Sequence, residues 1–306
     1  MSARLHPLIL TASILTASSL ACTPAERPTA RAASVDPAPL SLDCGPSTDC
    51  GRPLDCGPPI DGAGALTEAG ALVLFGEIHG THEVAEFVGG FVCQGLEMGL
   101  EVHLGLELPA AQADAVQSYL ASEGLESDRA ALLAGAHWQR EDQDGRSSEA
   151  VAGLIERARQ WRAAGRPIAV FTFDVDGEHE WNERDAAMAT RILAETEAHP
   201  DALTVTLSGN LHNRTVQGLP WDPEARPMGG SIHAARPDAS SLDLRHHGGS
   251  AWICMSDGCG PTELSGASEG PSWAIERWPD ADEFGYDGVF WVDTISAAAP
   301  AKTSAE

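Results

Sequence analysis

The feature that most constrains the fold of this chain is a regular alternation of apolar, β-branched runs with helical stretches from residue 63 onward. The runs typical of strands are 71–77, 102–108, 167–174, 203–210, 251–255 and 288–293, with a weaker one at 241–246. The stretches with helical character are 82–99, 109–121, 147–164 and 180–198. Strands separated by helices form mainly parallel sheets, and continuous apolar runs indicate strands buried on both faces. The sequence therefore predicts one α/β domain over residues 63–300, followed by a short tail at 301–306.

Titratable side chains follow the ends of four successive predicted strands. Glu77 and His79 stand at the end of the first strand, and Glu107 ends the second. Asp174 ends the third, and His212 follows the fourth. Because parallel sheets place their sites just past the carboxyl ends of the strands, we expect these side chains to share one crevice. A single acidic strand end is often a turn former or a helix cap, but four in register favour a functional site.

One chemistry that fits these residues uses a divalent metal. His79, His212, Glu107 and Asp174 are ligand types that suit Zn²⁺, Mn²⁺ or Co²⁺. Such a metal lowers the pKa of a bound water and makes it a nucleophile at neutral pH. The H-E-x-x-H signature of zinc proteases is absent from the sequence, so the metal hypothesis depends on the fold bringing these residues together.

A second chemistry needs no metal, and the sequence leaves both open. Glu77 or Glu107 would orient His79 and raise its basicity, so that His79 activates water or accepts a proton. Arg184 or Asn210 would stabilise an oxyanion. The sequence lacks a G-x-S-x-G elbow and the glycine-rich phosphate-binding motifs, which disfavours serine catalysis and nucleotide binding.

The first 62 residues are expected to lie outside the folded domain. Arg4 and the apolar stretch that ends at Ala21 have the layout of a secretory signal over residues 1–21. Cys22 directly after it favours a lipid anchor, with ordinary signal cleavage as the alternative. Residues 22–62 are rich in Pro, Ala, Ser and Gly, which predicts a disordered tether. We therefore expect a membrane-anchored lipoprotein of the bacterial envelope, or a periplasmic or secreted protein if Cys22 is not lipidated.

Export allows disulfides, so the positions of the cysteines are informative. Cys254 and Cys259 flank an Asp-Gly turn in "WICMSDGCG", which predicts a tight hairpin closed by a disulfide. Cys93 lies on a predicted helical face and is expected to be a buried thiol. Three Asp-Cys-Gly units in the tether contain thiols whose redox state the sequence leaves open, those of Cys44, Cys50 and Cys56.

The charge of the chain limits its partners. The sequence contains 45 acidic and 19 basic residues, which gives a formal net charge of −26. A chain this acidic repels phosphate backbones, so nucleic acid is excluded as a partner. The expected partners are a small-molecule or peptide substrate and, through the lipid anchor, a membrane. The oligomeric state cannot be predicted from the sequence.

Several motifs, in the same order along the chain, resemble a superfamily that includes the erythromycin esterases, the haem-associated lipoprotein ChaN and the Tiki and TraB proteins. "GEIHGTHE" at 76–83 resembles its G-E-x-H opening, and "GLELP" at 105–109 resembles its second-strand glutamate motif. "WNERDAAMATRI" at 181–192 is similar to its R-(D/E)-x-x-M-A helix, and "SGNLHNR" at 208–214 to its late histidine motif. The overall layout is most similar to the ChaN-like lipoproteins, and the resemblance covers residues 70–300.

This resemblance implies a three-layer α/β sandwich, with a mainly parallel sheet flanked by helices and the site at the carboxyl ends of the strands. It also implies a site that holds Glu77, His79, Glu107, Arg184 and His212. Because members of the superfamily differ in function, the fold does not settle the activity. Our first expectation is a hydrolase of ester or amide bonds. The alternative is a surface lipoprotein that captures haem or a metal without catalysis.

Overall fold

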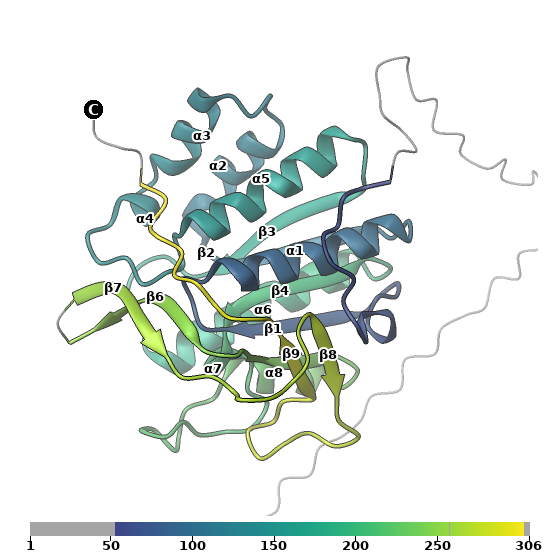
Figure 1. Ribbon diagram of the computed structural model, residues 1–306, viewed down its shortest axis with the longest axis vertical. Coiled ribbons are helices and arrows are strands. Elements are labelled where there is room, and N and C mark those ends of the chain that lie inside the picture. Colours follow the sequence, from purple (N-terminus) through teal and green to yellow (C-terminus); the bar gives the residue numbers. More distant parts are fainter. Residues whose placement is uncertain (1–52, 257, 303–306) are drawn as a thin grey trace, which may run out of the picture. The chain divides into compact units, whose positions relative to one another are not determined.

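The computed structural model describes residues 53–256 and 258–302, and a seven-stranded sheet runs through them (Figure 1). The strand order is β3-β2-β4-β1-β5-β9-β8. These strands are β1 (Leu72–Glu77), β2 (Val102–Pro109), β3 (Ile168–Asp174), β4 (Leu203–Gly209), β5 (Ser240–Arg245), β8 (Ala274–Arg277) and β9 (Gly288–Trp291). Neighbouring strands pair in parallel, except that β8 and β9 pair antiparallel. The predicted α/β class with a mainly parallel sheet is confirmed.

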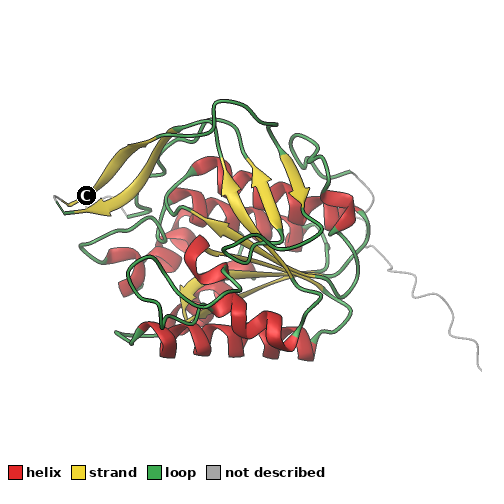
Figure 2. Ribbon diagram, turned by 90° about the horizontal axis from the view of Figure 1, so that it is seen from below, coloured by secondary structure: helices red, strands yellow, loops and turns green. Residues whose placement is uncertain are grey.

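Helices cover both faces of this sheet, which gives the expected three layers (Figure 2). The helices on one face are α1 (His82–Glu97), α2 (Ala113–Leu120), α3 (Glu126–Leu133) and α5 (Glu149–Ala163). Those on the other face are α6 (Trp181–Ala198) and α8 (Met228–Ala235). The shorter elements in the connections are α4 (Ala136–Gln139), α7 (Asn210–Asn213) and the 3₁₀ turns Ala63–Ala65 and Ala110–Gln112.

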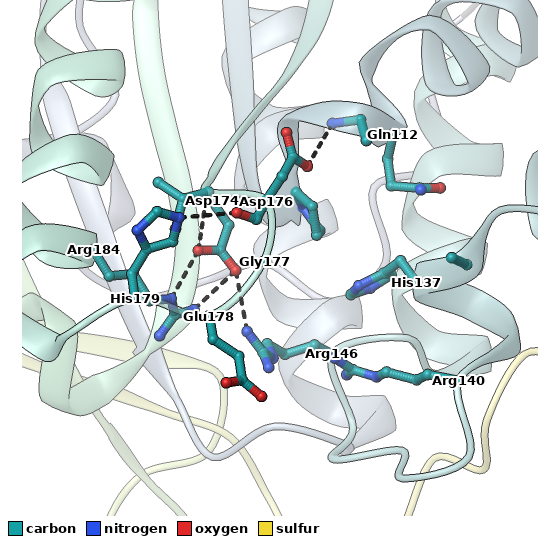
Figure 3. Close-up of a pocket in the computed structure, with 14 residues that line it drawn as sticks. Gln112, His137, Arg140, Arg146, Asp174, Asp176, Gly177, Glu178, His179 and Arg184 are labelled. Atoms are coloured by element: carbon teal, nitrogen blue, oxygen red, sulfur yellow. Dashed lines mark hydrogen bonds and ion pairs between the residues drawn. The ribbon is translucent and has the colours of Figure 1, made fainter.

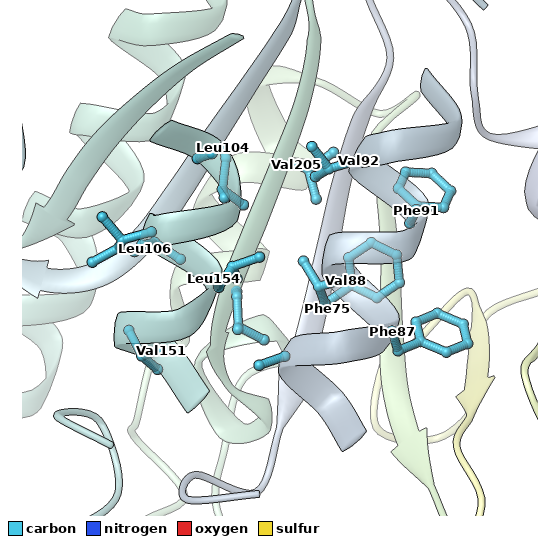
Figure 4. Close-up of a cluster of buried hydrophobic side chains, with 14 of the residues drawn as sticks. Phe75, Phe87, Val88, Phe91, Val92, Leu104, Leu106, Val151, Leu154 and Val205 are labelled. Carbon is cyan, nitrogen blue, oxygen red and sulfur yellow. The ribbon is translucent and has the colours of Figure 1, made fainter. Parts of the chain in front are cut away.

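Strand β1 shows why an uninterrupted apolar run belongs in the middle of such a sheet. Val73 and Phe75 point into the core that α1 and α5 cover, whereas Leu72 and Leu74 point into the core under α6 and α8. All four side chains are at most 1% exposed. Figure 4 shows Phe75 among the aromatic and aliphatic side chains of the first core. Because successive residues of a strand face opposite ways, burial on both faces demands apolar residues at every position.

The strand order also determines where on the sheet the crevice lies. Strand β4 lies between β1 and β2. The chain leaves β1 and β2 toward the face that carries α1 and α5, and it leaves β3 and β4 toward the face that carries α6 and α8. The carboxyl ends of β1, β2 and β4 therefore meet where the connections diverge, which is where open parallel sheets form their binding sites.

The apolar run at 251–255 is a strand, but it lies outside this sheet. It belongs to β6 (Gly249–Met255), which pairs antiparallel with β7 (Gly258–Leu264) in a separate two-stranded hairpin. Cys254 and Cys259 are paired across this hairpin and joined by a disulfide, the pair that the sequence suggested. The second half of the strand is partly or fully exposed, so its apolar residues do not mark a core position.

The expectations for Cys93 and for the end of the tether need correction. Cys93 is not a free thiol, because it forms a disulfide with Cys56. The described part of the expected tether, residues 53–62, therefore packs on the domain, where Ile60 is 6% exposed and Asp61 forms a β-bridge with Ala274. A segment without apolar periodicity can still be ordered when one covalent link and one buried side chain hold it in place.

Other expectations fall outside the described residues. These are the signal at 1–21, the anchor Cys22, the thiols of Cys44 and Cys50, and the end of the tail after residue 302. Within residues 53–256 and 258–302, no helix is long and apolar enough to cross a membrane.

Candidate functional site

The strand ends bring the expected side chains together. Glu77 ends β1, Glu107 lies near the end of β2, and Asp174 ends β3. Arg184 enters from the first turn of α6, and His212 lies on the short helix α7 that follows β4. Hydrogen bonds or short ion pairs join each of these residues to at least one other residue of the site. We call this set, together with His79, the strand-end cluster.

His79 lies between two carboxylates. Its Nδ1 is 2.9 Å from Oε1 of Glu77, and its Nε2 is 3.5 Å from Oε2 of Glu107. The imidazole side chain is 20% exposed, while the two carboxylates are 7% and 4% exposed. Burial lowers the pKa of His79, but the charges of Glu107 and Glu77 outweigh it and raise this pKa above its ordinary value. Burial raises the pKa of Glu77.

Glu107 is the hub of the cluster. Its Oε2 accepts a hydrogen bond from the Gly209 backbone N–H at 2.7 Å, and its Oε1 accepts one from Nη2 of Arg184 at 2.6 Å. Burial alone would raise the pKa of this carboxyl, yet the charges of His79, Arg146 and Arg184 lower it far below its usual range. Glu107 is therefore ionised at neutral pH.

Arg184 holds three groups of the cluster at once. Besides Glu107, it donates from Nε to Oδ1 of Asp174 at 2.8 Å and from Nη2 to Oδ2 at 2.9 Å. Its Nη1 is 2.9 Å from Nε2 of His212. A guanidinium can only donate, so Nε2 of His212 must be the acceptor. These bonds with two carboxylates raise the pKa of Arg184, against burial, which lowers it.

The bond from Arg184 fixes the protonation of His212. Since Nε2 accepts, the proton of the neutral ring is on Nδ1, from which it is donated to Asp185 at 2.8 Å. Asp185 is fully buried and also accepts from the Met228 backbone N–H at 2.8 Å. Trp181 stacks on the imidazole with ring centroids 4.6 Å apart. His212 is thus held in one orientation, and its Nε2 already accepts a hydrogen bond from Arg184.

Arg146 is a member of the cluster that the sequence analysis did not identify. It lies in the loop between α4 and α5 and donates from Nη1 to Asp174 at 3.1 Å and to Glu107 at 3.4 Å. Its Nε and Nη2 bind Asp144 at 3.0 and 2.7 Å. Burial would raise the pKa of Asp144, but its bonds and attraction to Arg146 lower it to about 2. No strand end or motif marks this loop, so sequence patterns do not point to Arg146.

The hairpin β6–β7 supports the loop that carries Arg146. The indole Nε1 of Trp252 donates to the Gln143 carbonyl at 3.0 Å, and its backbone N–H donates to the Gly80 carbonyl at 2.9 Å. A Cβ at Gly145 would lie 2.5 Å from the Gly80 nitrogen, and Gly145 has a φ of +93°. The loop can therefore approach the end of β1 this closely because residue 145 is glycine.

A cavity of about 690 Å³ opens beside the cluster (Figure 3). Arg146, Asp174 and Arg184 line it, but His79 and His212 do not. Arg146 also lines a much smaller space next to His79, so this side chain lies at the boundary between the cavity and the imidazole. The cavity is therefore a candidate substrate site that reaches the cluster through its arginines.

His137 lines the cavity and has one ring nitrogen without a partner among the described residues. It is 7% exposed, and its Nε2 has no hydrogen-bond partner among the described residues. Burial first, and then the charges of Arg140 and Arg146, lower its pKa to about 4. His137 is therefore neutral at physiological pH.

The donor atoms of the strand-end cluster do not fit a metal ion. Both oxygens of Asp174 accept hydrogen bonds from arginine, and Nε2 of His212 accepts one from Arg184. The guanidinium groups of Arg146 and Arg184 thus lie among the expected ligands, and their positive charges would repel a metal cation. The expected ligands are His79, His212, Glu107 and Asp174. The cavity does not suit haem either, because arginine and carboxylate side chains form much of its lining.

Comparisons with known proteins give the fold of this chain. No protein-family model matches the sequence, and neither does any curated protein. A solved structure of a Bacillus cereus protein matches with a TM-score of 0.52 at 11% identity, over 78% of this chain and 92% of that chain. A succinoglycan biosynthesis protein matches with a TM-score of 0.52 at 8% identity, over 75% and 89%. This chain shares its fold with both.

A third similar structure is the erythromycin esterase EreC, with a TM-score of 0.47 at 12% identity, over 78% of this chain and 94% of that chain. The fold shared with the first two structures agrees with the expected α/β class. Identities this low do not carry an activity across, so the function must be argued from the site itself.

Proposed function

We propose that the protein is a hydrolase that cleaves an ester or amide bond in a small molecule or peptide, with His79 as the group that moves the proton. One observation carries the proposal. A partly exposed imidazole lies between two buried carboxylates at the carboxyl end of a parallel sheet, with Nδ1 2.9 Å from Glu77 and Nε2 3.5 Å from Glu107. Groups whose pKa is shifted by burial and by a specific charge partner are typical of active sites.

The carboxylates give His79 the properties of a general base. Glu77 accepts the Nδ1–H, which leaves Nε2 to take a proton from an attacking water. Glu107, which is ionised, stabilises the imidazolium that forms. On collapse of the tetrahedral intermediate, the same Nε2–H returns the proton to the leaving group, so protons balance over the cycle. No step requires a metal.

Arg146 is the best candidate for oxyanion stabilisation. A guanidinium has five N–H donors, and the four bonds to Asp144, Asp174 and Glu107 use four of them. Its position at both the cavity and the space beside His79 would let it contact a substrate carbonyl. Arg184 has the different role of holding Asp174, Glu107 and His212 in place.

The test is turnover of a panel of p-nitrophenyl esters and peptide amides by the purified protein. His79→Gln should lower kcat/KM by about 10²- to 10⁴-fold, the range for a lost general base. His82→Gln is the matched control, because His82 begins α1 and lines a different pocket, with Glu86 and Arg157. Equal activity of both variants would refute the proposal. A haem Soret band without turnover, lost in His79→Gln, would favour ligand capture instead.

We also propose that the protein is exported and anchored through Cys22. The support is the pair of disulfides, Cys56–Cys93 and Cys254–Cys259, because disulfides persist in oxidising compartments and are rare in the cytosol. Incorporation of a fatty-acid analogue that is lost in Cys22→Ala would agree with the anchor. Export without incorporation would mean ordinary signal cleavage.

A further inference from the structure

A second cluster of imidazoles and carboxylates lies at the other end of β2. His103 is the second residue of this strand, and Glu107 is four residues further on. At roughly 3.3 Å per residue, about 13 Å of strand separates the two clusters. Glu101 directly precedes β2, while Glu195 and His199 lie one helical turn apart at the end of α6. The beginning of a strand and the end of a helix thus bring four ligand-type side chains to one place.

His103 has a carboxylate at each nitrogen. Its Nδ1 is 2.6 Å from Oε1 of Glu195, and its Nε2 is 2.9 Å from Oε1 of Glu101. The ring centroids of His199 and His103 are 4.2 Å apart, and Nδ1 of His199 is 4.0 Å from Oε1 of Glu101. His103 is 2% exposed, so this cluster is built into the edge of the core rather than spread over the surface.

We propose that Glu101, His103 and His199 bind a divalent transition metal, for which Zn²⁺ is the best match. Two imidazoles and one carboxylate form a common zinc ligand set. Their ligand atoms lie within 4.8 Å of one another. A tetrahedral zinc with bonds of about 2.0–2.1 Å spaces its ligands about 3.4 Å apart. Glu101 and His199, whose side chains are 56% and 45% exposed, have room to rotate toward that spacing.

Glu195 completes the argument for a metal. Histidine ligands usually donate their second ring N–H to a carboxylate, which fixes the tautomer and turns the other nitrogen toward the metal. Glu195 has this relation to Nδ1 of His103 and leaves Nε2 facing Glu101 and His199. Hydrogen bonds between His103 and two carboxylates explain two of these contacts but give His199 no role. A metal uses all four side chains.

The site would join the two elements that also position the strand-end cluster. Helix α6 carries Arg184 near its beginning and His199 just after its end, and β2 carries both His103 and Glu107. A bound metal would hold the far end of α6 against β2. The three protein ligands leave a fourth position for water.

The test is Zn²⁺ binding to the full chain, without a histidine tag and stripped with a chelator, measured by calorimetry and by thermal unfolding. The wild type should bind one equivalent and unfold at a higher temperature with Zn²⁺. His199→Ala and Glu101→Gln, both exposed and tolerant of substitution, should weaken binding at least 10-fold. Glu195→Gln should weaken it by about 10- to 100-fold.

The controls are His233→Ala on α8 and His79→Ala in the strand-end cluster, and both should bind Zn²⁺ like the wild type. Three results would overturn the proposal. They are unchanged affinity in His199→Ala and Glu101→Gln, loss of the equivalent in His79→Ala, and no saturable binding up to about 1 mM. Since the site is independent of His79, failure here leaves the proposed hydrolase unaffected.

Discussion

Arg184 donates a hydrogen bond from Nη1 to Nε2 of His212 at 2.9 Å. This one contact divides the roles of the two imidazoles in the strand-end cluster. Nε2 of His212 already accepts a hydrogen bond from the positively charged guanidinium of Arg184. Nε2 of His79 instead lies 3.5 Å from a carboxylate, on a partly exposed ring. His79 is therefore the imidazole that can exchange a proton with a substrate, and His212 helps to hold the arginine.

Replacing Arg184 should destabilise the protein strongly. Arg184→Ala leaves Asp174 and Glu107, each with a side chain only 4% exposed, with fewer compensating charges. Breaking a buried pair in this way costs about 3–5 kcal/mol of unfolding free energy. Urea denaturation measures it. Arg236→Ala removes a surface pair with Asp238 and should cost less than about 1 kcal/mol. Similar losses in the two variants would contradict the central role given to Arg184.

The raised pKa of His79 predicts a specific pH dependence. Burial opposes protonation, but Glu107 and Glu77 raise this pKa above 6.5. A general base works when neutral, so kcat/KM should rise with pH through the pKa of His79. Glu77→Gln removes one of the two stabilising charges and should move this acid limb to lower pH. Glu86→Gln, on the exposed side of α1, is the control and should leave the limb in place.

The raised pKa of His79 also predicts how the free energy of unfolding depends on pH. A group whose pKa is raised on folding stabilises the folded state fully below its unfolded pKa and loses this contribution as pH rises through the folded value. The stabilisation by His79 should therefore decrease as the pH rises above 6.5. The free energy of unfolding of His79→Gln should lack this pH-dependent contribution. If the difference in unfolding free energy between the wild type and His79→Gln does not change with pH, His79 is not protonated in the folded protein.

Gly209 should be irreplaceable for activity but not for folding. A Cβ at this position would lie 2.9 Å from Nε2 of His79, so Gly209→Ala must displace the imidazole. The φ of −55° is open to any residue, so the backbone itself is not strained. We expect kcat/KM to fall by about 100-fold with little change in unfolding free energy. Gly153→Ala on α5, where a Cβ meets nothing within 4 Å, should keep activity and gain about 0.5–1 kcal/mol.

The parts of this molecule that the sequence predicted are those encoded by local periodicity. Apolar runs marked six of the seven strands of the main sheet, all but β8. Polar strand ends marked Glu77, Glu107 and Asp174, because a parallel sheet aligns those ends by geometry alone. Arg146 escaped prediction because a loop residue reaches the cluster through tertiary packing that no period records. Disulfide Cys56–Cys93 escaped for a similar reason, since its first cysteine lies in a segment with a linker-like composition.

The two disulfides should have separable effects. Cys56–Cys93 closes 37 residues, and in the chain-entropy estimate such a loop stabilises the folded state by about 4 kcal/mol, against about 2 kcal/mol for a short one. Cys56→Ala/Cys93→Ala should therefore lower the unfolding free energy more than Cys254→Ala/Cys259→Ala, whose cysteines are 5 residues apart. Neither Cys56 nor Cys93 is part of the strand-end cluster, so the first variant should retain its kcat/KM below its unfolding temperature.

The hairpin disulfide should instead affect catalysis. It closes β6–β7, and Trp252 of this hairpin holds the Gln143 carbonyl in the loop that carries Arg146. A displacement of this loop by about 1 Å moves a guanidinium that contacts Glu107 and Asp174, and misplacements of this size cost up to about 100-fold in rate. Cys254→Ala/Cys259→Ala should therefore lower kcat/KM, and Trp252→Phe, which keeps the ring but loses the Nε1–H, should reproduce most of the loss. If both variants keep full activity while Arg146→Ala does not, the loop holds Arg146 without the hairpin.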